Sequence, residues 1–308
     1  MKPFVAILAV AVLAAGCRME EKSETTTTPA TPAPATASAA PAFDENAWRA
    51  EISEWQKNRT VRLTSEDGWT TLVGLHWLKQ GDNDVTLANG TKLKAVLNGT
   101  KVTLEGKPPM TVNDKPISGP TPLLDDNDEG GPNIVKMGTV RFNVIERGPR
   151  FGLRVKDSNA ETRTGFKGLE YYPIEPKWRV EARLDPYNPV KKIPITDITG
   201  LTADSDSPGA LVFTLGGQEY RLDPILEEGS DDLFLIFRDG TSKDTTYPAG
   251  RYLYAKKPGA DGKTVIDFNR AYNPPCTFTP FATCPLPPLQ NRLPIRIEAG
   301  EKKYAGAH

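Results

Sequence analysis

Short runs of β-favouring residues, separated by turn signals, constrain the fold of this chain more than any other feature. The runs share a richness in Val, Ile, Phe, Tyr and Thr, and they lie at residues 101–104, 139–145, 150–155, 178–184, 210–215, 233–237, 251–255 and 264–268. Pairs such as Asn98-Gly99 and Asp239-Gly240 mark tight turns between them. Many short strands at roughly ten-residue spacing predict a mainly β fold with an antiparallel sandwich or barrel-like body.

One amphipathic helix is expected at the start of this β-rich part. Asp44 can cap its N-terminus, because an Asp side chain accepts hydrogen bonds from the first free backbone amides of a helix. Trp48, Ile52 and Trp55 then recur at helical spacing and form one apolar stripe. The pattern predicts a helix of about three turns that packs on the core through this stripe.

An acidic, turn-rich segment at residues 121–132 is a possible seam between two β subdomains. Its Asp125, Asp126, Asp128 and Glu129 offer the hard oxygen ligands that calcium prefers, but their spacing does not fit an EF-hand loop. A solvated connection is therefore the preferred interpretation, and we predict no metal site.

Residues 1–17 have the pattern of a lipoprotein signal peptide. Lys2 precedes an apolar run at residues 4–15, and the sequence Leu13-Ala14-Ala15-Gly16-Cys17 resembles a bacterial lipobox. The run is shorter than the roughly twenty residues that a transmembrane helix needs. We expect Cys17 to be lipidated and to anchor the chain in a bilayer of the cell envelope, with plain secretion as the alternative. Arg18, in place of an Asp, favours the outer membrane facing the periplasm.

Residues 18–42 are predicted to be a disordered Thr/Pro/Ala tether. Such a composition cannot bury enough apolar surface to offset the entropy that is lost on ordering. Residues 43–304 remain as a β-rich globular domain, a length that fits one large domain or two small ones.

The charge balance and the motifs exclude some classes of partner. The chain has 38 basic and 39 acidic residues, so nothing steers it toward nucleic acid. The sequence contains neither a Gly-x-Gly-x-x-Gly motif after a predicted strand nor a P-loop, so no nucleotide and no other cofactor is predicted.

Cys276 and Cys284 are the cysteines that remain after the lipobox. Outside the cytoplasm such a pair tends to oxidise, so a disulfide is the preferred interpretation. Closing a loop of about nine residues would stabilise the fold by roughly 2.5 kcal/mol. Two free thiols, a metal pair and a nucleophile are the alternatives, although zinc would need further ligands and the chain offers only His76 and His308.

A proline-rich block near the C-terminus combines acids, amides, arginines and a phenol on a restrained backbone. The candidate binding residues are Asp267, Asn269, Arg270, Tyr272, Asn273, Asn291, Arg292 and, from an earlier strand, Arg251. Asp267 alternates with Ile266 and Phe268, so it is expected to point away from the core toward this block. Pairing of Asp267 with Arg292 or Arg251 would hold the block in one conformation, or would orient a ligand.

Three residues are candidates for catalysis, since a carboxylate or an imidazole can act as a general acid or base: Asp267, Asp239 and His76. His76 lies between Leu75 and Trp77 in an apolar run, so a core histidine bonded to a neighbouring carbonyl is the preferred interpretation. With two histidines in the chain, a Ser-His-Asp or Cys-His unit is not expected unless His76 is the base.

Several motifs together are similar to a bacterial family catalogued as domain of unknown function sixteen eighty-four. The motifs are Gly68-Trp69, residues 73–78, 154–157, 166–173, 233–239 and 246–251, and the block from Asp267 to Arg292 that continues to Glu301. The resemblance spans nearly all of the globular part. It implies a fold relationship with that family, and it implies no activity.

Three classes of function remain open. The first is a binding module that recognises an envelope glycan, a peptide or a small metabolite through a polar C-terminal pocket, and this is the preferred one. The second is a structural or assembly lipoprotein in which the block is only a stapled lid. The third is a hydrolase with a carboxylate as general acid or base.

Overall fold

The structure is a computed structural model that describes residues 43–105 and 109–306. From Asp44 onward, the described residues form one compact unit. The predicted signal peptide, the lipidation site Cys17, the tether at 18–42 and His308 lie outside the described residues. In the part of the chain that is described, no helix is both long and apolar enough to cross a membrane.

The N-terminal helix α1 (Glu45–Leu63) is present, and it is longer than the three turns expected. Asp44 caps it by accepting a hydrogen bond of 3.0 Å from the backbone amide of Ala47. Trp48 and Ile52 are buried as predicted, and the buried face continues through Arg59 and Leu63. The apolar pattern hid this continuation because one of the two later positions is an arginine.

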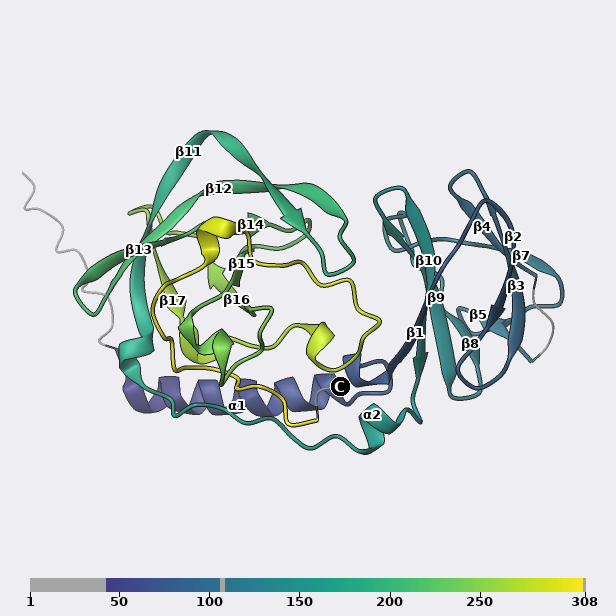
Figure 1. Cartoon of the computed structure of the whole chain (residues 1–308), viewed down its shortest axis with the longest axis horizontal. Helices are drawn as coiled ribbons and strands as arrows, with labels where there is room; N and C mark the ends of the chain where they lie inside the picture. Colours follow the sequence, from purple (N-terminus) through teal and green to yellow (C-terminus); the bar gives the residue numbers. More distant parts are fainter. Residues whose placement is uncertain (1–42, 106–108, 307–308) are drawn as a thin grey trace, which may run out of the picture. The chain divides into compact units, whose positions relative to one another are not determined.

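Ten strands form the N-terminal lobe, an antiparallel sandwich of two sheets (Figure 1). They are β1 (Leu72–Trp77), β2 (Gly81–Thr86), β3 (Lys92–Asn98), β4 (Lys101–Glu105), β5 (Thr111–Val112), β6 (Lys115–Pro116), β7 (Pro120–Leu123), β8 (Val135–Met137), β9 (Val140–Arg147) and β10 (Arg150–Asp157). The sheet orders are β1-β10-β9-β8-β5-β6 and β2-β3-β4-β7. Both sheets contribute to one core, in which Leu104, Val144 and Leu153 are fully buried.

The segment at residues 121–132 lies inside this lobe. It comprises the end of β7 and most of the loop that leads to β8. Leu123 before the loop and Val135 after it belong to the same hydrophobic core. The chain leaves the lobe only after β10, through the short helix α2 (Glu161–Thr164).

The C-terminal lobe contains seven strands in two further antiparallel sheets that form a half-barrel (Figure 1). The first sheet has the order β13-β12-β11-β17, from β11 (Arg179–Thr196), β12 (Thr202–Leu215), β13 (Gln218–Leu222) and β17 (Lys263–Asp267). The second has the order β14-β15-β16, from β14 (Ile225–Leu226), β15 (Asp232–Phe237) and β16 (Arg251–Lys256). Side chains such as Phe213, Phe237 and Phe268 join the two sheets in one core.

Six short 3-10 turns complete the described secondary structure. They are η1 (Trp69–Thr71), η2 (Pro176–Trp178), η3 (Gly240–Lys243), η4 (Phe268–Arg270), η5 (Pro275–Thr277) and η6 (Leu289–Asn291). Three of them belong to the proline-rich block, which therefore has fixed local geometry without regular strands. The prediction of a mainly β, antiparallel fold with one N-terminal helix is confirmed.

The two lobes meet along the loop that follows Cys276. The Thr279 hydroxyl donates a 2.8 Å hydrogen bond to the Leu72 carbonyl at the start of β1. Thr283 accepts bonds of 3.4 Å from Arg147 at the end of β9 and from Arg154 of β10. This loop therefore connects the sandwich to the half-barrel, and it forms part of the site described below.

Candidate functional site

Asp267 serves the fold, because its carboxylate is already saturated by protein donors. It is buried at the end of β17 and accepts a 2.7 Å bond from the indole N–H of Trp48 in α1. It also accepts bonds from the Asn269 backbone amide at 3.1 Å and from the Asn269 side-chain amide at 2.8 Å. The arginine near it is Arg270, 3.9 Å away, and not Arg292 or Arg251 as expected.

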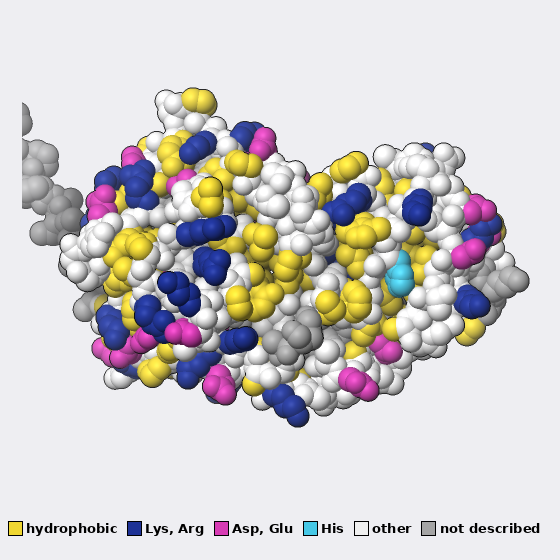
Figure 2. Space-filling model, viewed as in Figure 1, with side chains coloured by type: hydrophobic (Ala, Val, Ile, Leu, Met, Phe, Trp, Pro, Cys, Tyr) yellow, Lys and Arg dark blue, Asp and Glu magenta, His cyan; other side chains and the backbone are white. Residues whose placement is uncertain are grey.

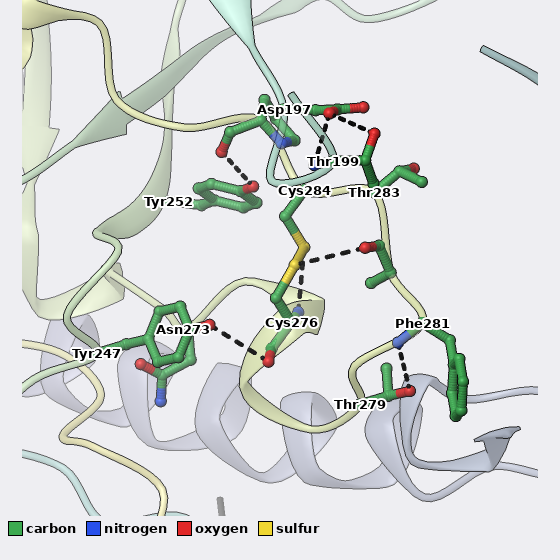
Figure 3. Close-up of a disulfide and its surroundings, with 12 residues drawn as sticks. Asp197, Thr199, Tyr247, Tyr252, Asn273, Cys276, Thr279, Phe281, Thr283 and Cys284 are labelled. Atoms are coloured by element: carbon green, nitrogen blue, oxygen red, sulfur yellow. Dashed lines mark hydrogen bonds between the residues drawn. A yellow bond between two sulfur atoms is a disulfide. The ribbon is translucent and has the colours of Figure 1, made fainter. Parts of the chain in front are cut away.

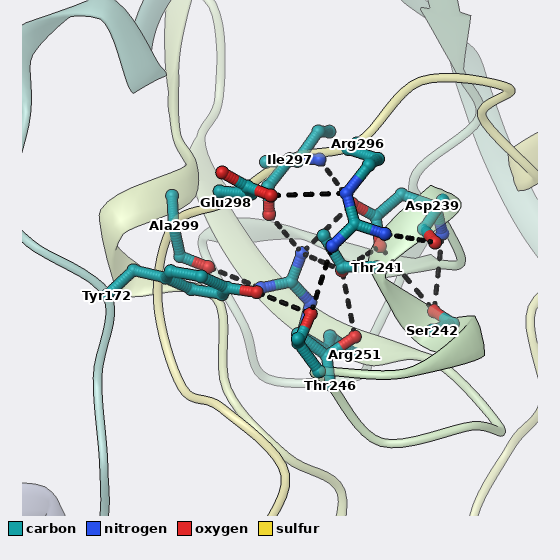
Figure 4. A network of polar contacts seen from close by, with 12 residues as sticks. Tyr172, Asp239, Thr241, Ser242, Thr246, Arg251, Arg296, Ile297, Glu298 and Ala299 are labelled. Carbon is teal, nitrogen blue, oxygen red and sulfur yellow. Dashed lines mark hydrogen bonds and ion pairs between the residues drawn. The ribbon is translucent and has the colours of Figure 1, made fainter.

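Arg251 and Asp239 form a buried ion pair inside the C-terminal lobe (Figure 4). Arg251 is fully buried and donates to the Asp239 carboxylate at 3.3 Å and to the carbonyls of Ile297 and Ala299. Asp239 also accepts bonds from the Thr241 hydroxyl at 2.7 Å and from the Ile297 amide at 2.6 Å. These contacts tie the segment that contains Ile297 and Ala299, here called the C-terminal strap, to the turn after β15. The Arg251 guanidinium and the Asp239 carboxylate are both enclosed by protein.

The three predicted asparagines connect backbone segments. The Asn291 side-chain amide donates to the carbonyls of Asp223 and Ile236 and accepts from the Asp223 amide at 2.8 Å. Asn269 bonds the backbone of Glu175 in the same two-way manner, at 3.0 and 3.1 Å. Asn273 donates its backbone amide to Glu301 and its side-chain amide to the Lys302 carbonyl, each at 2.8 Å.

The remaining predicted residues lie apart from one another. His76 is half-buried on β1 in the N-terminal lobe, where partial burial lowers the pKa of its imidazole below the usual value. Arg292 is exposed after η6, and Arg270 forms a 2.7 Å ion pair with Glu51 of α1. Asp267, Asp239 and His76 therefore do not form a catalytic group.

Cys276 and Cys284 form a disulfide, as predicted (Figure 3). Their Cα atoms are 6.2 Å apart, and both residues are buried. The loop that they close contains Thr279 and Thr283, which form hydrogen bonds with the N-terminal lobe. The disulfide therefore holds the connection between the lobes.

A pocket with a cavity volume of about 590 Å³ opens where the lobes meet. Its walls come from helix α1, from β9 and β10, from β15 and β16, and from the disulfide loop at residues 282–285. Figure 2 shows hydrophobic side chains gathered between the lobes on the face in view, with Lys and Arg side chains on both sides of them. Of the predicted binding residues, Tyr272 lines this pocket.

Positive charge dominates the pocket. Four arginines line it, against the single lining carboxylate of Glu227: Arg59, Arg62, Arg147 and Arg154. Arg59 is neutralised by Glu301 at 2.8 Å, and Arg147 is neutralised by Asp126 at 2.8 Å. Arg62 is exposed at the helix surface.

Arg154 differs from the other lining arginines because it is partly buried and has no carboxylate partner within ion-pair distance among the described residues. Its Nη2 donates to the Thr283 hydroxyl at 3.4 Å, and its guanidinium lies 5.5 Å from the ring of Trp69. Its Nε is buried without a hydrogen-bond partner in the described part of the chain. Burial, and then the charge of Arg147, lower its pKa to about 10, so it remains a cation at neutral pH.

Aromatic side chains also line the pocket, and Arg59 lies over the Tyr272 ring at 4.6 Å. Phe234 and Tyr254 face each other across β15 and β16 with their rings stacked at 4.9 Å. Tyr252 and Tyr272 make an edge contact at 5.8 Å. Burial raises the pKa of Tyr272 to about 12, so its hydroxyl stays protonated at neutral pH. Tyr254 donates to Glu227 at 2.7 Å.

None of the four lining arginines was among the predicted binding residues, although β10 carries a usable signal for Arg154. Leu153 and Val155 are buried in the sandwich core, and alternation places Arg154 between them on the opposite face of the sheet.

The acidic run at 121–132 has a structural use, since Asp126 pairs with Arg147 and Asp125 accepts from the Asn127 amide at 2.8 Å. Across residues 43–105 and 109–306, no group of three or more His, Cys, Asp or Glu side chains is placed to hold a metal ion.

Comparison with known proteins gives a family and no activity. The model of the family described as "Protein of unknown function (DUF1684)" matches residues 164–302, so Gly68-Trp69 and the other N-terminal motifs lie outside the matched range. The solution NMR structure of the uncharacterized protein from gene locus rrnAC0354 of Haloarcula marismortui is 31% identical, covering 47% of this chain and 80% of that chain, with a TM-score of 0.40. No curated protein matches the chain.

Proposed function

Since residues 164–302 belong to the family described as protein of unknown function (DUF1684), we propose a function from the pocket itself: the chain binds a small organic anion. The observation that carries this proposal is Arg154, a partly buried guanidinium without a carboxylate partner among the described residues. A partly buried charge that is left unpaired is unfavourable, whereas an anionic ligand in the pocket would pair with the guanidinium.

The other walls support an organic anion over a bare inorganic one. Rings of Trp55, Trp69, Phe234, Tyr252, Tyr254 and Tyr272 line the same pocket. Aromatic rings bind the apolar part of a ligand, while a small number of polar groups orient it. The cavity volume of about 590 Å³ falls within the roughly 300–1,000 Å³ that is typical of small-molecule sites.

Binding is better supported than hydrolysis. Asp267 and Asp239 have their oxygens occupied by protein donors, and His76, on β1, is not among the lining residues. Glu227 is the carboxylate at the pocket, and it is exposed and accepts the Tyr254 hydroxyl. A general acid or base placed opposite Arg154 therefore has little support.

Replacement of Arg154 by Gln is the test of the proposal. Using the full chain, we expect galacturonate, glucose 6-phosphate or phenyl phosphate to raise the melting temperature, and calorimetry to give a dissociation constant. In Arg154→Gln the affinity should fall roughly tenfold or more, since hydrogen bonds to charged groups contribute about 1.5–3 kcal/mol.

Arg150→Gln is the matched control. Arg150 lies on the same strand and covers the Trp77 ring at 4.3 Å, but it does not line the pocket. Its replacement should leave the affinity unchanged. Failure of every anion to bind, or equal weakening by the two substitutions, would refute the proposal.

The N-terminal sequence supports an envelope location for this binding module. The lipobox ending in Cys17 and the Thr/Pro/Ala segment at 18–42 fit a lipid anchor and a tether, with the outer membrane facing the periplasm as the destination. The ligand would then be an envelope glycan, a peptide or a small metabolite.

We expect Cys17→Ser to move the full chain from the membrane fraction to the soluble fraction, because the substitution removes the lipid attachment site. An unchanged distribution on cell fractionation would contradict the anchor.

A further inference from the structure

The arginine-lined pocket adjoins a second one. The second pocket has a volume of about 570 Å³ and lies against α1, β16 and β17. Trp55, Tyr254 and Tyr272 line both pockets, so these three rings form the boundary that the two pockets share. Tyr254 is 39% exposed, which leaves part of its surface open to a ligand that crosses this boundary.

The two pockets differ in charge. The second is lined by three basic and three acidic side chains, in place of four arginines and one glutamate. Three ion pairs join its lining residues: Arg270 with Glu51 at 2.7 Å and with Asp267 at 3.9 Å, and Lys256 with Asp232 at 2.9 Å. The second pocket therefore adds little attraction for a carboxylate, but the hydroxyls of a sugar unit, acidic or neutral, can bond to the outer atoms of these pairs.

We infer that the ligand is an acidic oligosaccharide that spans both pockets, with an acidic sugar at Arg154 and a further sugar in the second pocket. This inference rests on the proposed function of the first pocket. A sugar ring has an apolar face that packs on an aromatic ring and hydroxyls that bond to ion-paired side chains. The groove formed by the two pockets offers both aromatic rings and ion-paired side chains. Each volume by itself falls in the range of roughly 300–1,000 Å³ for a small-ligand site, so a ligand that fills both has at least two units.

A peptide is a weaker fit to the same groove. Extended peptides usually bind by adding a strand to a free sheet edge. At the boundary between the pockets this edge is occupied, because Tyr252 and Tyr272 exchange two backbone hydrogen bonds of 2.9 Å. A peptide is therefore one of the alternatives that the experiment tests.

Calorimetry of the full chain with galacturonate, tetragalacturonate, glutamate and tetraglutamate tests this inference. We expect tetragalacturonate to bind roughly tenfold or more tightly than galacturonate, because the second unit binds at a high effective concentration. Val265→Trp on β17 and Glu51→Trp on α1 each place a large ring in the second pocket. Either substitution should remove the gain with length and leave the affinity for galacturonate unchanged.

The possible outcomes separate the two proposals. Equal affinity for galacturonate and tetragalacturonate, or a gain that survives both blocking substitutions, would overturn the oligosaccharide and leave the anion site standing. A gain with length for tetraglutamate alone would identify a peptide and also overturn it. Absence of binding by any anion would refute the proposed function together with the inference. Because the two substitutions are on different elements, misfolding of one variant still leaves the other to decide.

Discussion

Arg251→Met is expected to lower the free energy of unfolding by roughly 3–5 kcal/mol. The substitution keeps most of the side-chain volume but removes the cation that faces Asp239 in a fully buried site. The Asp239 charge would then be buried without its partner, and the carbonyls of Ile297 and Ala299 would each lose the hydrogen bond from Arg251. Urea unfolding followed by circular dichroism measures this as a lower midpoint with an unchanged slope.

Arg296→Met is the matched control, and Figure 4 shows Arg296 beside the same network. Arg296 pairs with Asp244 at 3.0 Å and with Glu298 at 3.1 Å, but these side chains are all substantially exposed. Exposed pairs contribute only about 0–1 kcal/mol. If the two substitutions have the same effect, the buried pair is not what holds the C-terminal strap.

The fold could be predicted from the sequence because its signals are local. Alternation within each run and a Gly-containing turn after it are enough to predict a strand. The length of α1 was underestimated for a physical reason. Arg59 is at a core-facing position of the helix and is buried there only because Glu301, 242 residues later, neutralises it.

The site could be predicted only in part, because residue type does not reveal a partner that is distant in the sequence. Asp267 is a residue type that can act as a catalytic acid. Its carboxylate instead accepts a hydrogen bond from Trp48, 219 residues earlier. The pocket is assembled from helix, strand and loop segments of both lobes. Of the predicted binding set it contains Tyr272, and the disulfide pair contributes Cys284. Asn269, Asn273, Asn291 and Arg251 are buried, whereas Asp267 and Arg270 line the second pocket and Arg292 is exposed. This distribution is a property of packing, and the sequence does not show it.

Arg59→Met is the second substitution expected to have a large effect, also roughly 3–5 kcal/mol of unfolding free energy. Arg59 joins α1 to the end of the chain: its Nε donates to Glu301 at 2.8 Å, and its Nη2 donates to the Asn273 carbonyl at 2.8 Å. Glu301 is fully buried, so its carboxylate would be left with the Asn273 amide and no cation. Urea unfolding measures the loss.

A double-mutant cycle shows whether the buried charge is the cause. Adding Glu301→Gln to Arg59→Met removes the unpaired carboxylate, so the double variant should be more stable than Arg59→Met alone, with a coupling of roughly 0.5–3 kcal/mol. Simple additivity would contradict this account. Stability and ligand-affinity measurements together separate the arginines of the pocket by role. Arg59 is already neutralised by the fold and should act through stability, whereas Arg154 has no such partner and should act through ligand affinity.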